Sequence, residues 1–237
     1  MKHLNLIILL SMCILSIAKS YAQSPQAFSE IDNLSNSTWL PLTFKNIAKH
    51  TDYQLVVEDG NTVVHARTED SASLLVTRFN VKPDEHLKLH WCWKVSNIFE
   101  AGDARSKSGD DYPARIYIAF AFDAKSATFM EKLKYNAANA FTEDTLPGSA
   151  LNYIWANKLP AGQIVNNPYS EQTKMIAVQS GKAELGQWVC NSRDIVADYQ
   201  TAFGHAPPPI IAIGIMSDSD NTGESAEAWY DDIRIED

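Results

Sequence analysis

The sequence predicts a mainly β protein, a two-sheet antiparallel sandwich of the jelly-roll type with one or two short helical insertions. Three observations favour this class. Short runs rich in β-branched and aromatic residues recur between turn residues along the chain. Helical segments do not alternate regularly with these runs, as they would in a parallel α/β fold. No repeat or linker-like stretch divides the pattern, so residues 38–237 are expected to form one domain.

A hairpin is expected early in the domain, followed by a half-buried strand. Residues 53–57 and 62–66 are rich in β-forming side chains, and Asp59-Gly60-Asn61 between them is typical of a hairpin turn. Residues 74–81 then alternate apolar with polar positions, which is the period of a strand with one buried face.

Two strands in the middle of the chain differ in their patterns. Residues 87–95 carry apolar side chains at every odd position, so His90 and Cys92 should point away from the core. Residues 115–122 are apolar on both sides, which predicts a central, covered strand with Arg115 and Tyr117 on one face.

The connection between these two strands is long and polar. Residues 96–114 contain six charged residues and two glycines. Loops of this length without structure of their own are uncommon, and are usually functional or disordered. We therefore expect this connection to form the rim of a functional surface.

Two helices are expected as insertions in the β pattern. Apolar side chains recur at every fourth position of residues 126–141, which is a helical period. Residues 194–203 form the second expected helix, with Gly204 as its C-terminal cap. The remaining strands are expected at residues 151–155, 174–179, 210–216 and 229–235.

Residues 1–22 have the pattern of a secretory signal peptide. Lys2 supplies the positive start, and the apolar run 6–18 is too short to span a membrane as a helix. Small residues before the junction predict cleavage after Ala22. We therefore expect a periplasmic or secreted protein that does not span a membrane after signal removal, with a flexible lead-in at residues 23–37.

The acidic composition narrows the classes of partner. The chain has 20 Lys and Arg against 29 Asp and Glu, which gives a formal net charge of -9. An acidic chain without a basic stripe is a poor nucleic-acid binder, so no nucleic-acid partner is expected.

Two cysteines lie beyond the expected cleavage site, Cys92 and Cys190. In an oxidising compartment such a pair suggests one disulfide. Two separate buried thiols are the alternative, because the sequence does not give the distance between the two Cα atoms.

Several common catalytic and metal motifs are missing from the sequence. It has no Gly-x-Ser-x-Gly nucleophile turn and no His-Glu-x-x-His helix. Ser180-Gly181-Lys182 lacks the first glycine of a phosphate-binding loop. His86 and His90 would lie about 13 Å apart on one face of a strand, too far to share a zinc ion.

An acidic turn near the C-terminus suggests a calcium site. Asp218 and Asp220 place oxygen ligands at alternate positions, and Gly223 permits a sharp turn. The twelfth position holds Trp229, where an EF-hand needs a glutamate, so the match to that class fails. A different site would use Asp218, Asp220 and Asp232 for a structural calcium ion. The alternative is a turn in which these side chains bind their own backbone.

Asp110 and Asp111 beside Arg115 allow two interpretations. Neighbouring carboxylates would form an acid/base pair if like charges raised the pKa of one of them. The favoured alternative is an ion pair that fixes the long connection to the strand, because adjacent residues rarely point at one atom. For Asp194, the structural alternative is an N-terminal helix cap.

The aromatic residues suggest a groove for a saccharide. Sugars stack on exposed aromatic rings while polar side chains hold their hydroxyl groups. Core packing is the alternative for each ring. The expected ligand-binding residues are His90, Asp110, Asp111, Arg115, Tyr117 and Trp155.

Several short motifs follow one another in a single order. They are WCWKV at 91–95, GDD at 109–111, ARIY at 114–117, LNYIW at 151–155, RD at 193–194 and MSDSDNTG at 216–223. This order resembles the bacterial family named domain of unknown function 3047, over about residues 39–235. The resemblance implies an exported bacterial protein and no established activity. Cys92 and Cys190 stand where polar residues are expected in that family, which supports their pairing.

The last expected strand resembles a second family. Residues 229–235 are similar to the final strand of jelly-roll carbohydrate-binding modules, where an aspartate can ligate a structural calcium ion. Aspartates that cap a sheet edge are the alternative.

Three functions are consistent with these observations. The leading hypothesis is an exported protein that binds a saccharide or cell-envelope glycan on the Arg115 and Tyr117 face. A glycan hydrolase or lyase would use Asp110, Asp111 or Asp194 with Arg115. A non-catalytic envelope assembly protein would instead expose an apolar patch. Binding without catalysis is favoured.

Overall fold

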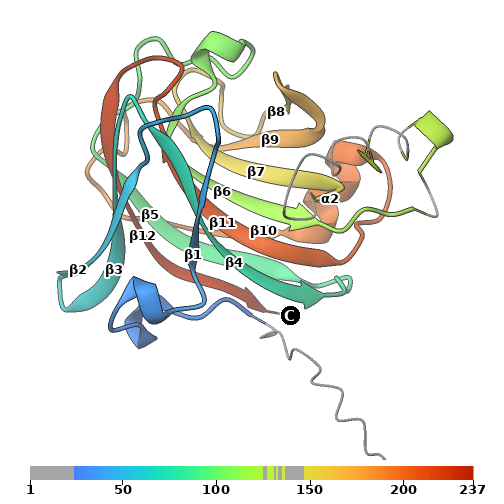
Figure 1. Cartoon of the computed structure of the whole chain (residues 1–237), viewed down its shortest axis with the longest axis horizontal. Coiled ribbons are helices and arrows are strands. Elements are labelled where there is room, and N and C mark those ends of the chain that lie inside the picture. The colour runs from blue at the N-terminus through green and yellow to red at the C-terminus, as the bar shows by residue number, and fades with distance from the viewer. Residues whose placement is uncertain (1–23, 125–126, 131, 133–134, 137–146, 237) are drawn as a thin grey trace, which may run out of the picture.

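The computed structural model describes residues 24–236, apart from 125–126, 131, 133–134 and 137–146, and shows two stacked β-sheets (Figure 1). The strands are Leu40–Thr43 (β1), Asp52–Glu58 (β2), Asn61–Glu69 (β3), Ala72–Val81 (β4), Lys88–Val95 (β5), Tyr112–Phe120 (β6), Ser149–Ala156 (β7), Ile164–Asn167 (β8), Ser170–Ser180 (β9), Val189–Asp194 (β10), Ile210–Asp218 (β11) and Ser225–Glu236 (β12). One sheet has the order β1-β4-β11-β6-β7-β9-β8, and the other has the order β10-β5-β12-β3-β2.

The predicted mainly β sandwich is confirmed. Neighbouring strands are antiparallel, except for the parallel pair β7 and β9. The chain crosses repeatedly between the sheets, from β3 to β4, then to β5 and then to β6, as in a jelly roll. Each sheet therefore buries one face against the other, and its outer face is the one turned away from the core.

The hairpin between β2 and β3 forms as predicted. Asp59 and Gly60 lie between the paired residues Glu58 and Asn61, with φ of 50° and 87°. Left-handed φ angles at both central residues twist a two-residue turn in the sense of the flanking strands.

Large aromatic side chains from both sheets fill the core. Trp91 and Trp93 of β5 face Tyr153 and Trp155 of β7, with ring centroids 5.3 Å apart for Trp91 and Tyr153 and 6.0 Å apart for Trp93 and Trp155. All four are at most 1% exposed. The odd positions of the 87–95 segment therefore face inward, as its alternation predicts.

The segment before the first strand corrects a prediction. A flexible lead-in is expected at 23–37, but Phe28 and Ile31 are only 2% and 5% exposed. The ring of Phe28 lies 5.1 Å from that of Trp39, whose Nε1 donates to the carbonyl of Gln26 at 2.9 Å. Two short 3-10 turns, Phe28–Glu30 and Leu34–Asn36, aim these few apolar side chains at the core. The expected signal peptide, 1–22, lies outside the described residues.

One of the two expected helices can be assessed. Helix α2 spans Ile195–Phe203, Asp194 Oδ1 accepts the N–H of Ala197 at 2.8 Å, and Gly204 ends the helix with φ of 81°. This confirms the expected helix at 194–203 and its cap. The helix expected at 126–141 lies mostly outside the described residues. Within the described part of the chain, no helix is long and apolar enough to cross a membrane.

Three strands are not predicted from the sequence. They are β1, β8 and β10, and each lies at an edge of its sheet. An edge strand has a single hydrogen-bonded neighbour and is only partly buried, so its apolar alternation is weak.

Candidate functional site

Arg115 lies on the outer face of the seven-stranded sheet but is sealed from solvent. Along β6, Ile116 and Ile118 face the core, so Arg115 and Tyr117 face outward as predicted. Only 3% of Arg115 is exposed, and its guanidinium carbon lies 4.8 Å from the centroid of the Tyr112 ring and 5.7 Å from that of Tyr117. The guanidinium is engaged by Asp110 and Asp218, which argues against the direct ligand contact predicted for Arg115.

Two buried aspartates surround the guanidinium of Arg115. Its Nη2 forms an ion pair with Asp218 and donates to the backbone carbonyl of Asp110 at 3.2 Å. Its Nη1 lies 3.6 Å from Asp110 Oδ1, and Asn167 donates to Asp110 Oδ2 at 2.8 Å. This arrangement matches the ion-pair interpretation, in which the long connection is fixed to the strands.

Asp111 ties two loops together. Its carboxylate accepts the backbone N–H groups of Asn221 at 3.0 Å and Thr222 at 2.6 Å, and the side-chain amide of Asn221 at 2.9 Å. Asp111 is fully buried. Its position therefore supports a structural role, rather than the ligand contact or catalytic role expected from the sequence.

Burial dominates the electrostatics of the Arg115 cluster. It raises the pKa of the Asp110 carboxyl, and the nearby Arg115 charge and the Asn167 hydrogen bond offset only part of that effect. Burial also opposes the charge of Arg115, yet the surrounding Tyr117 and Asp110 hold its pKa above the ordinary value. Asp110 already contacts Arg115 and Asn167, so its carboxylate is poorly placed to meet a substrate.

Three aspartates bring carboxylate oxygens within 4.8 Å of one another, and these are Asp111, Asp218 and Asp220. Asp232 is not among them, which corrects the predicted calcium set. It lies on β12 of the five-stranded sheet, with its Oδ2 3.8 Å from Cys92 Sγ.

The three aspartates offer the carboxylate oxygens that calcium prefers, but they supply too few of them to complete its coordination shell. Calcium takes six to eight oxygen ligands. Asp111 already accepts three N–H groups, and Asp218 already pairs with Arg115 and accepts the N–H of Tyr112. Backbone carbonyls or water would have to complete the shell. Calcium at this place stays a prediction.

Further along the same outer face, Tyr117 and Asn152 form a polar pair. The register places Tyr117 of β6 opposite Asn152 of β7, and Asn152 opposite Met175 of β9. Tyr117 is part-exposed, and its hydroxyl makes no hydrogen bond with the described residues. Asn152 is fully buried, and neither its Oδ1 nor its Nδ2 has a hydrogen-bond partner among the residues that the structure describes. Burial raises the pKa of Tyr117, so its hydroxyl stays protonated at neutral pH.

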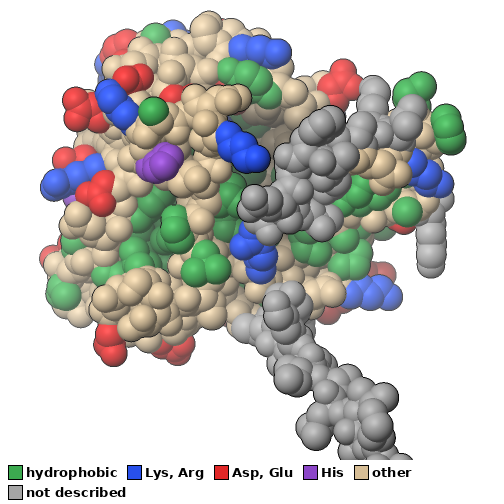
Figure 2. Space-filling view, in the orientation of Figure 1, with side chains coloured by type: hydrophobic (Ala, Val, Ile, Leu, Met, Phe, Trp, Pro, Cys, Tyr) green, Lys and Arg blue, Asp and Glu red, His purple; other side chains and the backbone are tan. Residues whose placement is uncertain are grey.

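Small residues lie beside Tyr117, and the space next to one of them, Gly214, is already filled by Val76 and Leu74. Gly214 of β11 lies opposite Tyr117, and a Cβ there would come within 3.1 Å of Val76 Cγ2 and 3.2 Å of Leu74 Cδ2. Figure 2 shows hydrophobic side chains exposed on the face toward the viewer, with single basic side chains among them. The small residues on this part of the face are Gly214, Ala212, Ala119 and Ala150.

Two predicted ligand-binding residues lie away from this face. His90 is on the outer face of the other sheet, where its Nε2 lies 3.1 Å from Glu236 Oε1. Trp155 is 0% exposed and faces the core beside Trp93. These positions correct the expectation that His90 and Trp155 line a groove with Tyr117.

The predicted catalytic set is not assembled at one place. Asp194 caps α2, and Tyr199 of that helix packs on Phe120 with ring centroids 4.5 Å apart. Asp110 precedes the opposite end of β6, and a strand of nine residues spans about 26 Å. The structure therefore separates Asp194 from Asp110, Asp111 and Arg115.

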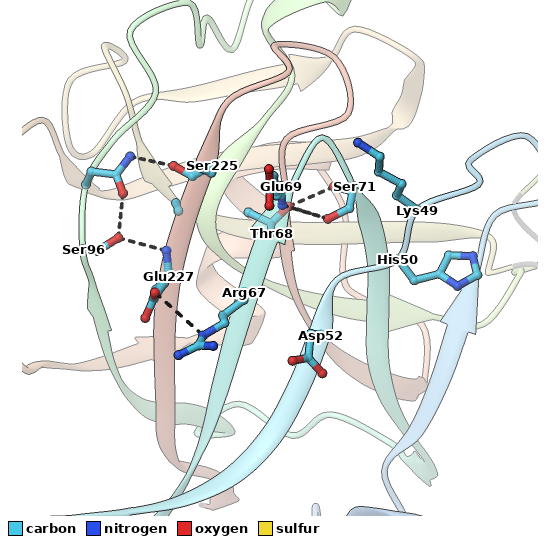
Figure 3. A pocket seen from close by; sticks show the side chains of 12 residues that line it. Lys49, His50, Asp52, Arg67, Thr68, Glu69, Ser71, Ser96, Ser225 and Glu227 are labelled. Atoms are coloured by element: carbon cyan, nitrogen blue, oxygen red, sulfur yellow. Dashed lines mark hydrogen bonds and ion pairs between the residues drawn. The ribbon is translucent and has the colours of Figure 1, made fainter.

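The outer face of the five-stranded sheet carries a polar groove of about 670 Å³ (Figure 3). Arg67 of β3 lies between Asp52 of β2 and Glu227 of β12, and its Nε is 3.7 Å from Glu227 Oε1. Next to the groove, Trp229 is stacked between the ring of His65, at 4.6 Å, and the ammonium group of Lys94, at 4.3 Å. Because both faces of this indole are covered, Trp229 does not offer a platform for a sugar ring.

Asn152 is a residue that the sequence analysis missed. It lies within the strand predicted at 151–155, where every neighbour is apolar or aromatic. An amide inside a strand buried on both faces is costly unless it is paired. That contrast is the signal in the sequence that marks Asn152.

Comparisons with known proteins give low-identity structural likenesses. A family 11 carbohydrate-binding module of the cellulosomal cellulase Lic26A-Cel5E of Clostridium thermocellum has a TM-score of 0.40 and 10% identity, covering 91% of this chain and 95% of that one. A family 11 module from Clostridium thermocellum in complex with a β-1,3-1,4-mixed-linked tetrasaccharide has a TM-score of 0.40 and 9% identity, covering 90% and 94%. SGBP-B from a xyloglucan utilization locus in Bacteroides uniformis has a TM-score of 0.35 and 14% identity, covering 82% and 48%.

The sequence comparisons give one family. No curated protein matches this sequence. The sequence profile of a family described as "Protein of unknown function (DUF3047)" matches residues 37–234, which is nearly the whole of the sandwich. The chain therefore belongs to the DUF3047 family.

Proposed function

We propose that this chain is an exported saccharide-binding protein whose ligand lies on the outer face of the seven-stranded sheet, beside Tyr117. The observation that carries the proposal is the part-exposed Tyr117, whose hydroxyl is unpaired among the described residues, next to the small residues around Gly214. A phenol ring offers a flat surface for a sugar ring, and its hydroxyl offers a hydrogen bond to a sugar hydroxyl.

The burial and the existing partners of the carboxylates favour binding over catalysis. Asp110, Asp111 and Asp218 are buried and engaged in ion pairs or hydrogen bonds. A glycosidase needs two carboxyl groups that flank an accessible bond. On this basis the Arg115 cluster supports the face structurally and does not act on the ligand.

Export is the second part of the proposal. It rests on the signal-like pattern of residues 1–22. The disulfide between Cys92 and Cys190 is consistent with it, because such bonds persist in oxidising compartments. Envelope glycans and their fragments are then the saccharides that the protein would meet.

A thermal-unfolding screen tests the binding function. The protein from Gln23 onward is heated with a panel of neutral oligosaccharides and peptidoglycan fragments. A ligand that binds only the folded state raises the midpoint with dose. We expect at least one member of the panel to do so, and Tyr117→Ala to remove the shift.

Tyr169→Phe is the control for this experiment, because Tyr169 is exposed on a different loop, where its hydroxyl lies 2.6 Å from Asn221 Oδ1. It should keep the saccharide shift. A panel that leaves the wild-type midpoint unchanged would contradict the proposal and favour an assembly role with a protein partner.

A further inference from the structure

We infer that Asn152 is the hydrogen-bonding anchor of this site and that its ligand is an uncharged saccharide with two adjacent free hydroxyl groups. The inference rests on the proposed function and adds the chemical class of the ligand. It is carried by a second observation, the unsatisfied amide of a residue that is 0% exposed.

The position of Asn152 is set by the sheet and not by a loop. In β7, Leu151 and Tyr153 face the core, so Asn152 points to the outer face. Tyr117 flanks it on β6 and Met175 flanks it on β9. An amide held between two strands in this way has a fixed place, and Tyr117 beside it is the part-exposed residue that borders solvent.

A buried side-chain amide without a hydrogen-bond partner is unusual in proteins. Most buried polar atoms have a partner, and those that lack one mark a functional group or a missing ligand. Within the described part of the chain, the neighbouring side chains do not pair with this amide. The Tyr117 hydroxyl makes no hydrogen bond there, and Met175 Sδ is within reach of Tyr112 and Asn167. A leucine at this position would pack without the loss of two hydrogen bonds.

The amide selects its ligand by offering one acceptor and one donor side by side. Adjacent hydroxyl groups of a sugar ring complement it, because one donates to Oδ1 while the other accepts from Nδ2. A carboxylate or phosphate brings acceptors only and would leave Oδ1 unpaired. The N–H and C=O of a trans acetamido group point in opposite directions, so they do not meet one amide together.

The nearby charges agree with an uncharged ligand. The Arg115 guanidinium behind Tyr117 is already compensated by Asp110 and Asp218. An anionic ligand would therefore meet no free cation from this cluster, and the chain as a whole has a net charge of -9. The amide of Asn152 and the hydroxyl of Tyr117 are neutral groups, and they match an uncharged ligand.

The test compares matched saccharides on matched variants by calorimetry and thermal unfolding. The probes are cello-, xylo- and manno-oligosaccharides, each with its per-O-methylated form, which lacks hydroxyl donors. The variants are Asn152→Leu, Asn152→Ala and the control Asn166→Ala, which changes an exposed amide on β8. We expect a free oligosaccharide to bind the wild type and Asn166→Ala, while its methylated form does not.

The Asn152 variants separate a ligand anchor from a structural residue. We expect Asn152→Leu to weaken binding at least tenfold and, without saccharide, to unfold at the wild-type midpoint or higher. Asn152→Ala should weaken binding to a similar extent. This second variant shows that the loss comes from removing the amide and not from the shape of the leucine side chain.

Three results would overturn the inference. If saccharides bind the wild type and Asn152→Leu equally, Asn152 is not the anchor, although the proposed function stands. If both Asn152 variants unfold well below the wild type without saccharide, the amide serves the fold, for instance through an internal water. A wild type that binds none of the free oligosaccharides overturns the inference, and one that binds no peptidoglycan fragment either removes the proposed function as well.

Discussion

At the residue scale, the burial of Arg115 makes a strong prediction about stability. Replacing Arg115 with Met leaves Asp218 and Asp110 buried without their cation. Breaking a buried pair in this way typically costs about 3–5 kcal/mol of unfolding free energy. Urea unfolding of Arg115→Met at neutral pH measures the loss.

Arg234→Met is the matched control, since Arg234 is exposed and pairs with exposed Asp232 and Glu236. This variant should lose less than about 1 kcal/mol of unfolding free energy. Equal losses for the two variants would show that the ion pairs of Arg115 contribute no more than surface pairs do.

Asp231 makes a prediction about pH. Burial is the largest effect and raises the pKa of its carboxyl above the ordinary value of 3.8; the hydrogen bond from the backbone N–H of Asp232 offsets part of this, and the charge of Asp232 adds to it. The folded state therefore binds more protons than the unfolded state, and this group lowers stability as pH rises from 3.8 through its folded pKa. Asp231→Asn should unfold at a higher urea concentration than the wild type at pH 7, and at the same concentration near pH 3. Urea unfolding at the two pH values checks this, and a gain that persists at pH 3 would contradict it.

The calcium prediction concerns Asp111, Asp218 and Asp220. A divalent cation would relieve the repulsion among these carboxylates and bind the folded state only. We expect calcium chloride to raise the thermal midpoint relative to EDTA, and Asp220→Asn to remove the difference. Asp232→Asn, outside the group, should keep it. Equal midpoints with calcium and with EDTA would exclude the site.

At the element scale, the disulfide holds an edge strand in place. Cys92 of β5 and Cys190 of β10 are opposite one another in the register, with Cα atoms 4.0 Å apart. The predicted pairing is thus present, and separate thiols are not. Because β10 is an edge strand, β5 is its sole strand neighbour in the described sheet.

Reduction of this bond should destabilise the protein. The bridge spans 98 residues in sequence, and loss of a native disulfide that closes a long loop typically costs about 2–5 kcal/mol. Urea unfolding with and without dithiothreitol measures the effect. The unfolding midpoint of a variant with Cys92→Ser and Cys190→Ser should not change with the reductant. An unchanged wild-type midpoint in reductant would mean that the bond does not stabilise the fold.

At the scale of the whole molecule, the two outer faces differ in chemistry. The seven-stranded sheet presents Tyr117 and Asn152 beside small residues. The five-stranded sheet presents a charged groove around Arg67 and a Trp229 ring covered on both faces. A saccharide that stacks on a ring and is held by neutral groups fits the first face better.

Export makes a prediction about the mature chain. The full sequence, expressed in a bacterium, should be cleaved after Ala22 and recovered from the periplasm with Gln23 at its N-terminus. Mass spectrometry of the purified protein checks the cleavage site. A chain that starts at Gln23 should stay in the cytoplasm. Recovery of the full-length mass would contradict the predicted signal.

Local patterns were enough to predict most elements. The alternation of residues 87–95 gave the strand and its inward tryptophans, and Asp59-Gly60 gave the hairpin. Asp194 and Gly204 gave the ends of α2. These features depend on neighbours two to four residues away, so the sequence carries them directly.

The site was less predictable, because strands buried on both faces do not tell which face is inner. All eight residues of β7 are buried, and the pattern of 151–155 therefore left the direction of Trp155 open. His90 and Tyr117 both point outward on their strands, but from opposite sheets. Sheet membership depends on long-range pairing, which periodicity does not report.

The sequence by itself determined the mainly β class, the hairpin, the capped helix and the placement of Arg115 and Tyr117 on one face of their strand, because each follows from local steric and periodic rules. Only the tertiary structure decided that Arg115 is covered, that Asp111 meets Asp218 and Asp220, and that the Asn152 amide has no partner among the described residues. These facts depend on which distant segments pack together, and that choice is made by the summed burial and hydrogen bonding of the whole chain.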